Sequence, residues 1–273
     1  MAKKSFCHRH PRDLEMVLER WFNQPLGQRI RRREQELLQD LSSGLFGYHL
    51  LQLGGFGRDL DHLAACPVKT KTIIGNVTDP VLGACLIRAD KRHLPVASDS
   101  TDAVILPHTL DFSDEPQQVL REVERVLIPE GRVIITGFNP YSLWGLWRLS
   151  NNWRGQVPWC GQFLSRRRLE DWLSLLGFDV ESAIGCEFFP PMNSAPEGEK
   201  WQKIDKIGRR YWPFLGSVYA VKAVKRVSRV RPITSPWRRL RAVRGRAVEP
   251  TTRLPGTLEF EPLEDQDLKK RSA

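Results

Sequence analysis

TDAVILPHTLDFSDEPQQVLREVERVLIPEGRVIITG, residues 101–137 of 273, is the stretch that decides the fold class of this chain. Residues 101–106 read as a buried β-strand, and apolar residues at helical spacing follow over 117–127. A turn at 129–131 ends this helix, and residues 132–137 read as another strand. A strand, a helix and a second strand in this order predict a right-handed crossover between parallel strands.

The same alternation of strand and helix signals continues on both sides of this segment. Three further strands are expected before it and two after it, at residues 48–53, 71–75, 84–88, 178–184 and 216–222. Ser165 is the expected N-cap of a helix that runs to Leu176, with Gly177 as its C′ residue. The sequence therefore predicts an α/β fold, a Rossmann-like, seven-stranded, mostly parallel sheet flanked by helices.

A helical segment precedes the sheet. Residues 13–40 have helical periodicity with a break at 25–27, so a second helix is expected from about Gln28. Three arginines at 31–33 are interleaved with glutamates in this second helix, and we interpret this charged run as a solvated helix face. A contact with phosphate or RNA is the alternative interpretation.

The positive charge is concentrated at one end of the chain. The net charge is +10, and residues 222–273 hold 14 Lys or Arg against six Asp or Glu, a balance of +8. Residues 227–273 contain few periodic apolar residues, which favours a disordered, basic C-terminal tail. We therefore expect three parts: an N-terminal helical segment packing on the core (1–47), the α/β domain (48–226) and the tail (227–273).

Composition argues against membrane spans and metal sites. The chain has no run of about 18 apolar residues, so a membrane-spanning helix is excluded. The N-terminal residues lack the apolar region of a signal peptide, so we expect a cytoplasmic location and no membrane partner. The cysteines are scattered and never occur at the Cys-x-x-Cys spacing, so no metal site is expected.

A glycine cluster follows the first expected strand. In an open α/β sheet, ligands bind outside the carboxyl ends of the central strands. Gly54, Gly55 and Gly57 lie at such an end, where glycine allows a ligand to approach the backbone closely. The cluster by itself does not identify the ligand, because glycine-rich turns have many causes.

Longer motifs carry a resemblance to a known family. They are an acid after the third strand at Asp90, Leu94-Pro95, Asp99-Ser100-Thr101-Asp102, the run from Leu120 to Ile135 with its Arg-Val-Leu-x-Pro-x-Gly, and Leu176-Gly177-Phe178. In order and spacing these motifs resemble the type 11 family of class I S-adenosylmethionine (SAM)-dependent methyltransferases. The segments 48–51, 106–110 and 137–142 are similar to a smaller group, the YafS-like bacterial proteins.

The resemblance implies S-adenosyl-L-methionine as cofactor and assigns roles to several residues. Asp90 would accept a hydrogen bond from the adenine amino group, which suits an acceptor-only carboxylate. The backbone at Lys91 would line the adenine. Leu106 and His108, at the end of the fourth strand, would face the methionine moiety and the transferred methyl group.

The chain departs from the family pattern at two of the three main cofactor contacts. The family begins the first loop with an acid, and this chain has Gln52 there. Phe56 and Arg58 occupy glycine positions if the loop is aligned on Gly54. Asn76 stands nearest to the position of the carboxylate that binds the ribose, and an amide lacks the charge-assisted strength of a carboxylate.

His108 is the best candidate for a general base, because it lies at the correct strand end and has a suitable pKa class. A histidine that packs or hydrogen bonds locally is the alternative. Asp111 and Asn139 are weaker candidates. The aromatic region 138–163, expected to be a long loop, forms either a lid over an apolar acceptor or a cap on the sheet edge.

Three functions are compatible with these features. The first is a SAM-dependent methyltransferase of unknown acceptor. The second is a catalytically inactive, methyltransferase-like interaction protein, which the altered loop favours. The third is an RNA-binding protein, because residues 222–246 contain ten basic residues and no acid and would contact nucleic acid weakly through phosphates.

Overall fold

A computed structural model describes residues 11–54, 63, 66–75, 84–151, 157–191, 211 and 215–226. Two helices come first, α2 (Pro11–Phe22) and α3 (Pro25–Ser42). Strands β1 (His49–Leu53), β2 (Thr70–Ile74), β3 (Ala84–Ile87) and β4 (Thr101–Pro107) follow. The remaining elements are α5 (Pro116–Val126), β5 (Leu127–Phe138), α6 (Leu143–Asn151), α7 (Arg166–Leu175), β6 (Phe178–Cys186) and β7 (Val218–Lys225). The chain divides into units 1–229 and 230–273, and the second lies outside the described residues.

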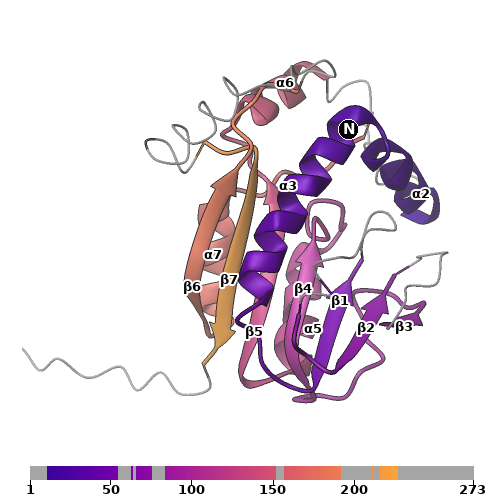
Figure 1. Ribbon diagram of the computed structural model, residues 1–273, viewed down its shortest axis with the longest axis vertical. Coiled ribbons are helices and arrows are strands. Elements are labelled where there is room, and N and C mark those ends of the chain that lie inside the picture. Colours follow the sequence, from indigo (N-terminus) through magenta and orange to yellow (C-terminus); the bar gives the residue numbers. More distant parts are fainter. Residues whose placement is uncertain are drawn as a thin grey trace, which may run out of the picture. The chain divides into compact units, whose positions relative to one another are not determined.

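The strands form one seven-stranded sheet in the order β3-β2-β1-β4-β5-β7-β6 (Figure 1). Strands β1 to β5 run parallel, and β7 is antiparallel to both β5 and β6. From β1 the chain continues to β2 and β3 on one side and to β4 and β5 on the other. The strand order therefore reverses between β1 and β4, and such a switch point opens a crevice for ligands at the carboxyl ends.

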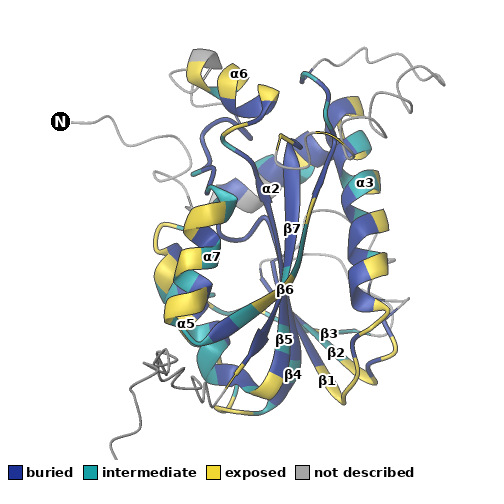
Figure 2. Ribbon diagram, turned by 90° about the vertical axis from the view of Figure 1, so that its left-hand side faces the viewer, coloured by how far each residue is buried: buried dark blue, intermediate teal, exposed yellow. Residues whose placement is uncertain are grey.

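Helices cover both faces of the sheet, with α3 on one face and α5 and α7 on the other (Figure 2). The side of α5 that faces the sheet is apolar: it carries Val119, Leu120, Val123 and Val126 at helical spacing, and all four are fully buried. Successive side chains of a strand point to opposite faces of the sheet and so enter different cores. In β4, Ile105 packs on the α3 side and Val104 on the α5 side. The predicted α/β class and sheet are confirmed.

Most predicted elements are present with small shifts at their ends. Strand β5 begins five residues earlier than expected, at Leu127, and β7 ends at Lys225 rather than at residue 222. The Ser165 side chain accepts a hydrogen bond from the Arg168 amide, and Gly177 has a φ of +84°, so the expected N-cap and C′ residue of α7 are confirmed.

Two helical predictions need correction. Helix α3 begins at Pro25, not near Gln28, because proline is favoured in the first turn of a helix, where its missing N–H would be unpaired in any case. The region 138–163 is not one long loop, because residues 143–151 form α6. The sequence does not predict α6, because its apolar residues occur on more than one side of the helix and show no single apolar face.

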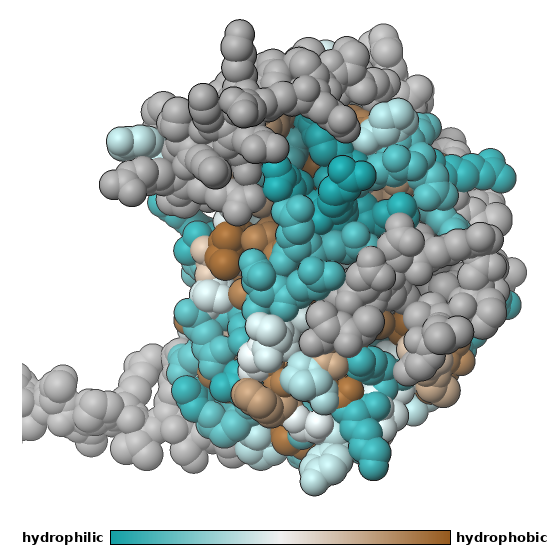
Figure 3. Space-filling view, in the orientation of Figure 1, coloured by the Kyte–Doolittle hydropathy of each residue, from teal (hydrophilic) through white to brown (hydrophobic). Residues whose placement is uncertain are grey.

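The outward face of α3 is hydrophilic, as predicted, and forms a band across the surface in Figure 3. One member of the charged run is an exception: Glu34 is only 6% exposed and points into the protein. Helix α3 lies against β5 and β7, so this carboxylate enters the core from outside the sheet. In the part of the chain that the structure describes, no helix is long and apolar enough to cross a membrane.

Candidate active site

Gly54 ends β1 at the switch point of the sheet. Its φ is +77°, a left-handed conformation that favours glycine. A Cβ atom there would lie 3.2 Å from both the Lys91 Nζ atom and the Thr109 hydroxyl oxygen. The Gly54 amide donates to the Ile74 carbonyl oxygen at 2.7 Å, which ties the loop to the end of β2. The chain therefore brings together the ends of β1, β2 and β4 and the segment after β3 around this glycine.

Gln52, which stands where the family has an acid, braces the same loop. Its side chain is fully buried, and its amide nitrogen donates to the Gly54 carbonyl oxygen at 2.9 Å. A carboxylate has no proton to donate at neutral pH and would face that carbonyl oxygen without a bond. The amide thus suits the conformation of this loop better than the acid does.

Thr109 connects the end of β4 to the end of β1. Its hydroxyl donates to the Leu53 carbonyl oxygen in a very short hydrogen bond. Because Leu53 directly precedes Gly54, the position of the glycine depends on the conformation of the chain just after β4. No sequence motif indicates this role, since threonine is common in loops for many reasons.

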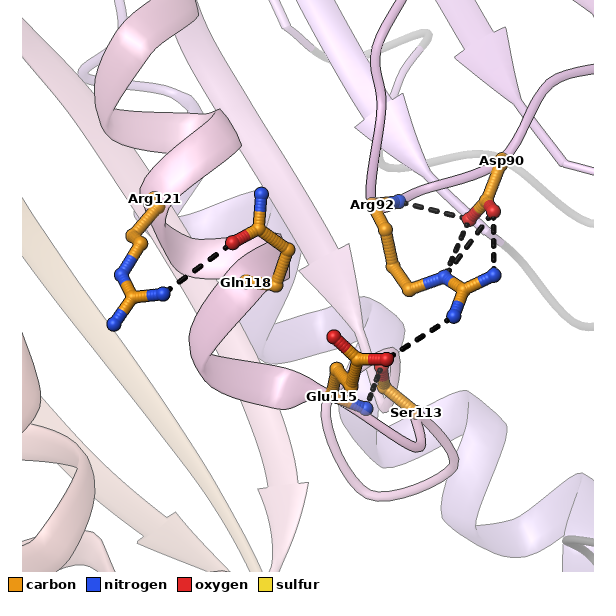
Figure 4. A network of polar contacts seen from close by, with 6 residues as sticks. All are labelled: Asp90, Arg92, Ser113, Glu115, Gln118 and Arg121. Carbon is orange, nitrogen blue, oxygen red and sulfur yellow. Dashed lines mark hydrogen bonds and ion pairs between the residues drawn. The ribbon is translucent and has the colours of Figure 1, made fainter.

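Asp90 follows β3 at the same end of the sheet and has a partner in Arg92 (Figure 4). The Arg92 guanidinium donates from Nη2 to Asp90 Oδ2 at 2.8 Å, and the Arg92 amide donates to Oδ1 at 2.9 Å. These hydrogen bonds, the side-chain one first, lower the pKa of Asp90 below its ordinary value of 3.8 although partial burial opposes them. Arg92 also bonds to Glu115 at 3.2 Å, which anchors the Asp90 segment to the start of α5.

The Asp90 side chain is 45% exposed, so its carboxylate is ionised and accessible from solvent. Such a carboxylate offers about four lone-pair positions. Arg92 donates to it from its amide, Nε and Nη2 atoms, so a ligand amine would share or exchange part of these hydrogen bonds. Asp90 is therefore placed as an acceptor at the edge where a ligand of this fold binds.

Three predicted cofactor residues, Gly55, Gly57 and Asn76, lie outside the described residues, as do Phe56 and Arg58. Leu106 is described, and its side chain is fully buried with the apolar residues on the α5 side of the sheet. It therefore packs in the core of the sheet, and its role toward the cofactor stays a prediction. Of the residues predicted for the cofactor, the structure brings Gly54, Lys91 and Asp90 to one end of the sheet.

His108 lies in the core and has no exposed surface. Its Nδ1 atom is 2.9 Å from the Asp111 Oδ2 atom, and its Nε2 atom is 3.6 Å from the Glu34 Oε2 atom. The ring stacks on Phe138, with the ring centroids 4.1 Å apart. This placement favours the local packing role over a general base, because an imidazole enclosed on all sides does not contact an acceptor.

The three ionisable groups form a buried cluster, which we call the Glu34–His108–Asp111 cluster. Burial alone lowers the pKa of His108, but the Glu34 carboxylate and the Asp111 hydrogen bond outweigh it and raise the pKa above 6.5. Burial raises the pKa of Asp111, and its bonds from His108 and from two backbone amides offset this only in part. Both shifts mean that His108 and Asp111 keep their protons to higher pH than they would in water.

The weaker candidates are also structural. Asp111 accepts a 2.9 Å hydrogen bond from the Phe138 amide and is 1% exposed. Asn139 donates to the Gly216 carbonyl oxygen at 2.9 Å and accepts from the Tyr141 amide at 3.0 Å. Both side chains therefore fix the chain where it leaves β5.

Some of the aromatic residues after β5 pack as a cap on the core, whereas Tyr141 and Trp147 are exposed. Phe138 and Trp144 are fully buried and stack with ring centroids 5.8 Å apart. Phe163 stacks on Phe138 at 5.0 Å, and Trp21 of α2 contacts Trp144 edge-on at 6.2 Å. The cap thus joins α2 to the carboxyl end of β5, and among the described residues no cluster of metal ligands accompanies it.

Comparison with known proteins agrees with this architecture. Residues 47–135 match the family model of a methyltransferase domain. The uncharacterised protein YafS of Escherichia coli K12 is 32% identical over 207 residues, which cover 76% of this chain and 80% of that protein. The expected family is thereby confirmed, and with it S-adenosylmethionine as the cofactor of the family.

Solved structures show the same fold. A SAM-dependent methyltransferase of Thermotoga maritima, a possible histamine N-methyltransferase, aligns with a TM-score of 0.50 and 19% identity over 77% of this chain and 99% of its own. A chain from the complex between the Haloferax volcanii Trm112 methyltransferase activator and the putative methyltransferase aligns with a TM-score of 0.53 and 14% identity, over 78% and 98%. Sheet order, the glycine turn after β1, the sequence motifs and these relatives lead to one conclusion: the chain belongs to the YafS-like group of the type 11 class I methyltransferase family.

Proposed function

We propose that this chain is an active methyltransferase that binds S-adenosylmethionine and transfers its methyl group to an acceptor not yet identified. The observation that carries the proposal is the placement of Gly54 and Asp90. They follow β1 and β3 and stand at the carboxyl end of the sheet beside its switch point. They are the turn and the acceptor that a nucleoside-containing ligand requires.

The residues present fit the cofactor. Gly54 has the left-handed turn that lets a ligand approach the backbone, and Asp90 is an ionised acceptor for an exocyclic amine. Gln52 holds the turn by its bond to the Gly54 carbonyl oxygen, which supports cofactor binding despite the missing acid. We therefore favour an active enzyme over an inactive interaction protein, and we keep the cytoplasm as its expected compartment.

When bound, the cofactor supplies a methyl group on a positively charged sulfur, which an acceptor displaces in line. Much of the acceleration of such a step comes from holding the two reactants in line and close together. The chain contributes a fixed turn at Gly54 and a cap that encloses the carboxyl end of β5. No described residue is assigned as a general base, because the imidazole of His108 is enclosed, so an acceptor that loses its proton to solvent is the simplest case.

Calorimetric titration of the full chain with S-adenosylmethionine and S-adenosylhomocysteine tests the proposal. We expect micromolar binding of both ligands by the natural protein. Asp90→Ala should weaken binding by about tenfold to a hundredfold, the size of a hydrogen bond to a charged group. Asp171→Ala, which removes an exposed carboxylate from α7, is the control and should leave the affinity unchanged.

The absence of both heat and thermal stabilisation at millimolar ligand would contradict the proposal. The inactive interaction protein would then be the better interpretation. The RNA-binding alternative rests on residues 222–246, most of which lie outside the described residues, and the comparisons give it no support.

A further inference from the structure

The Glu34–His108–Asp111 cluster lies at the meeting point of three parts of the chain. Glu34 belongs to α3, which precedes the matched methyltransferase domain at residues 47–135. His108 directly follows β4, and Asp111 stands three residues farther on. All three residues are at most 6% exposed. The methyltransferase motifs do not explain why a helix outside the domain should send a carboxylate into its core.

His108 adopts a strained backbone conformation at this point. Its φ is +49°, in the left-handed region that costs a residue other than glycine of the order of 1–3 kcal/mol. Such a conformation persists only where the surroundings fix it from several sides. Here the imidazole is held between two carboxylates, and the His108 amide donates to Thr136 of β5, to its hydroxyl oxygen at 3.1 Å and its carbonyl oxygen at 3.2 Å.

Glu34 closes this arrangement. The Thr136 hydroxyl accepts from the His108 amide and itself donates to Glu34 Oε1 in a very short hydrogen bond. The second carboxylate oxygen, Oε2, faces the His108 ring at 3.6 Å. One side chain of α3 therefore fixes the backbone of His108 through Thr136 and places a carboxylate beside its ring.

The next residue transmits that position to the cofactor turn. Thr109 donates to the Leu53 carbonyl oxygen, and its hydroxyl would lie 3.2 Å from a Cβ atom at Gly54. A shift of the backbone at His108 moves Thr109 and so removes the support of the turn at the end of β1. The path from α3 to Gly54 consists of direct contacts throughout.

The geometry points to Glu34 as a positioning residue for the cofactor turn, acting through His108 and Thr109. This inference rests on the proposed function, because it concerns the turn that would hold the cofactor. It makes one residue of α3 part of the binding machinery, although this helix lies outside the segment that carries the family motifs. Glu34 itself touches neither Gly54 nor the site of the ligand.

The arrangement also makes ligand binding depend on pH. The groups that face His108 are Glu34 from α3 and Asp111, and the Asp111 charge acts in turn on Arg148 of α6 and Tyr219 of β7. Below the raised pKa of His108, its imidazolium lies between two carboxylates and holds them. As the pH rises through that pKa, His108 loses its proton and two carboxylates face a neutral ring. The interactions that hold the backbone just after β4 then weaken.

The first test measures S-adenosylhomocysteine affinity of the full chain between about pH 6 and pH 9 by calorimetry, for the natural protein and for Glu34→Gln. We expect Glu34→Gln to bind about tenfold more weakly at neutral pH, the size of one charge-assisted contact. Its loss of affinity with rising pH should also move to lower pH, because the charge that helps to raise the pKa of His108 is gone.

Matched variants separate positioning from general damage. Glu36→Gln, on the same helix, removes an exposed carboxylate that pairs with Arg33 at 2.9 Å and should behave as the natural protein does. Glu34→Asp keeps the charge and should restore the natural pH profile in part. Equal affinity and an equal pH profile in Glu34→Gln and the natural protein would overturn the inference.

Hydrogen exchange keeps the inference testable if the natural protein binds no ligand, a result that would remove the proposed function alone. The Gly54 amide is hydrogen bonded to Ile74, and its exchange reports the turn directly. We expect faster exchange at Gly54 and at residues 106–111 in Glu34→Gln but not in Glu36→Gln. The same exchange rates in both variants would show that Glu34 does not position the turn.

Discussion

At the scale of single residues, Gln52 shows how a departure from a family pattern is accommodated. Its buried amide donates to the Gly54 carbonyl oxygen at 2.9 Å, a bond that the acid of the family cannot make when ionised. The conformation of the loop in this chain therefore depends on a donor at position 52.

We predict that Gln52→Glu, which introduces the residue type typical of the family, harms this protein. The buried carboxylate would face a carbonyl oxygen and lose the hydrogen bond, so the free energy of unfolding should fall by about 1–3 kcal/mol. Urea unfolding at neutral pH measures this change. Gln117→Glu, at an exposed position of α5, should change the free energy little, and an unchanged midpoint in Gln52→Glu would contradict the prediction.

Asp90 gives a prediction on pH. Its pKa is lowered chiefly by the hydrogen bond from Arg92, so Arg92→Ala should raise it toward 3.8. A group with a lowered pKa stabilises the folded state above its unfolded pKa, and this contribution is lost as the pH falls through the folded value. The stability advantage of the natural protein over Arg92→Ala should therefore be present at neutral pH and fade below about pH 4.

Titration of the Asp90 carboxyl group by NMR, together with thermal unfolding at several pH values, checks that prediction. Arg121→Ala is a suitable control, since Arg121 lies on α5 away from Asp90 in Figure 4 and bonds to Gln118 rather than to Asp90. An Asp90 pKa that does not move in Arg92→Ala would show that another group keeps it ionised.

The sequence predicts the positions of some residues in the candidate site and not of others, because a local pattern places a residue after a strand but does not show its tertiary contacts. Asp90 and Gly54 lie directly after strands, so the strand pattern placed them at the correct end of the sheet. For Glu34 the charged run predicts a solvated position, because three arginines precede it. Only tertiary contact reveals which way one glutamate points. His108 was placed at the correct strand end, but its enclosure by α2, α3 and the cap does not follow from local sequence.

At the scale of elements, helix α3 is the least expected contributor to the site. It packs on β5 and β7 through residues such as Ile30 and Leu38, each 1% exposed. Strands and the helices α5 and α7 were predictable, because each has one clear period of apolar residues. Helix α6 was not, since Leu and Trp side chains surround it: Trp144 is buried, whereas Leu146 is 64% exposed.

We predict that Ile30→Ala weakens the docking of α3. Removing a fully buried isoleucine side chain should lower the free energy of unfolding by about 2–5 kcal/mol, through lost burial and the cavity left behind. Chemical denaturation measures the loss, with Arg32→Ala on the exposed side of the helix as control. A loss below about 0.5 kcal/mol, the size of an ordinary surface substitution, would mean that α3 is only loosely attached.

At the scale of the whole molecule, Lys225 joins the last strand, β7, to the crossover through α5 that connects β4 and β5. The Lys225 amine donates to the Glu124 carbonyl oxygen at 2.7 Å, to the Leu127 carbonyl oxygen at 2.8 Å and to Asp99 Oδ1 at 3.0 Å. These acceptors surround the point where α5 passes into β5. The end of β7 is therefore fixed to the segment that decides the fold class.

Lys225→Met should destabilise the protein by about 1–3 kcal/mol, because it leaves carbonyl oxygens near the core without their donor. The thermal midpoint at neutral pH should fall accordingly. Lys69→Met removes an amine from an exposed position and serves as the control. If both variants unfolded at the same temperature, the lysine would be a surface group that contributes nothing to the closure of the sheet.

The antiparallel strand β7 lies between β5 and β6, although it follows both in the chain. During synthesis, β5 and β6 are therefore made before the strand that separates them. Until residue 225 is translated, each presents an open row of backbone donors and acceptors that invites pairing with the wrong strand. A nascent chain halted between Cys186 and Val218 would therefore hold an unfinished sheet, in which β5 lacks its antiparallel neighbour.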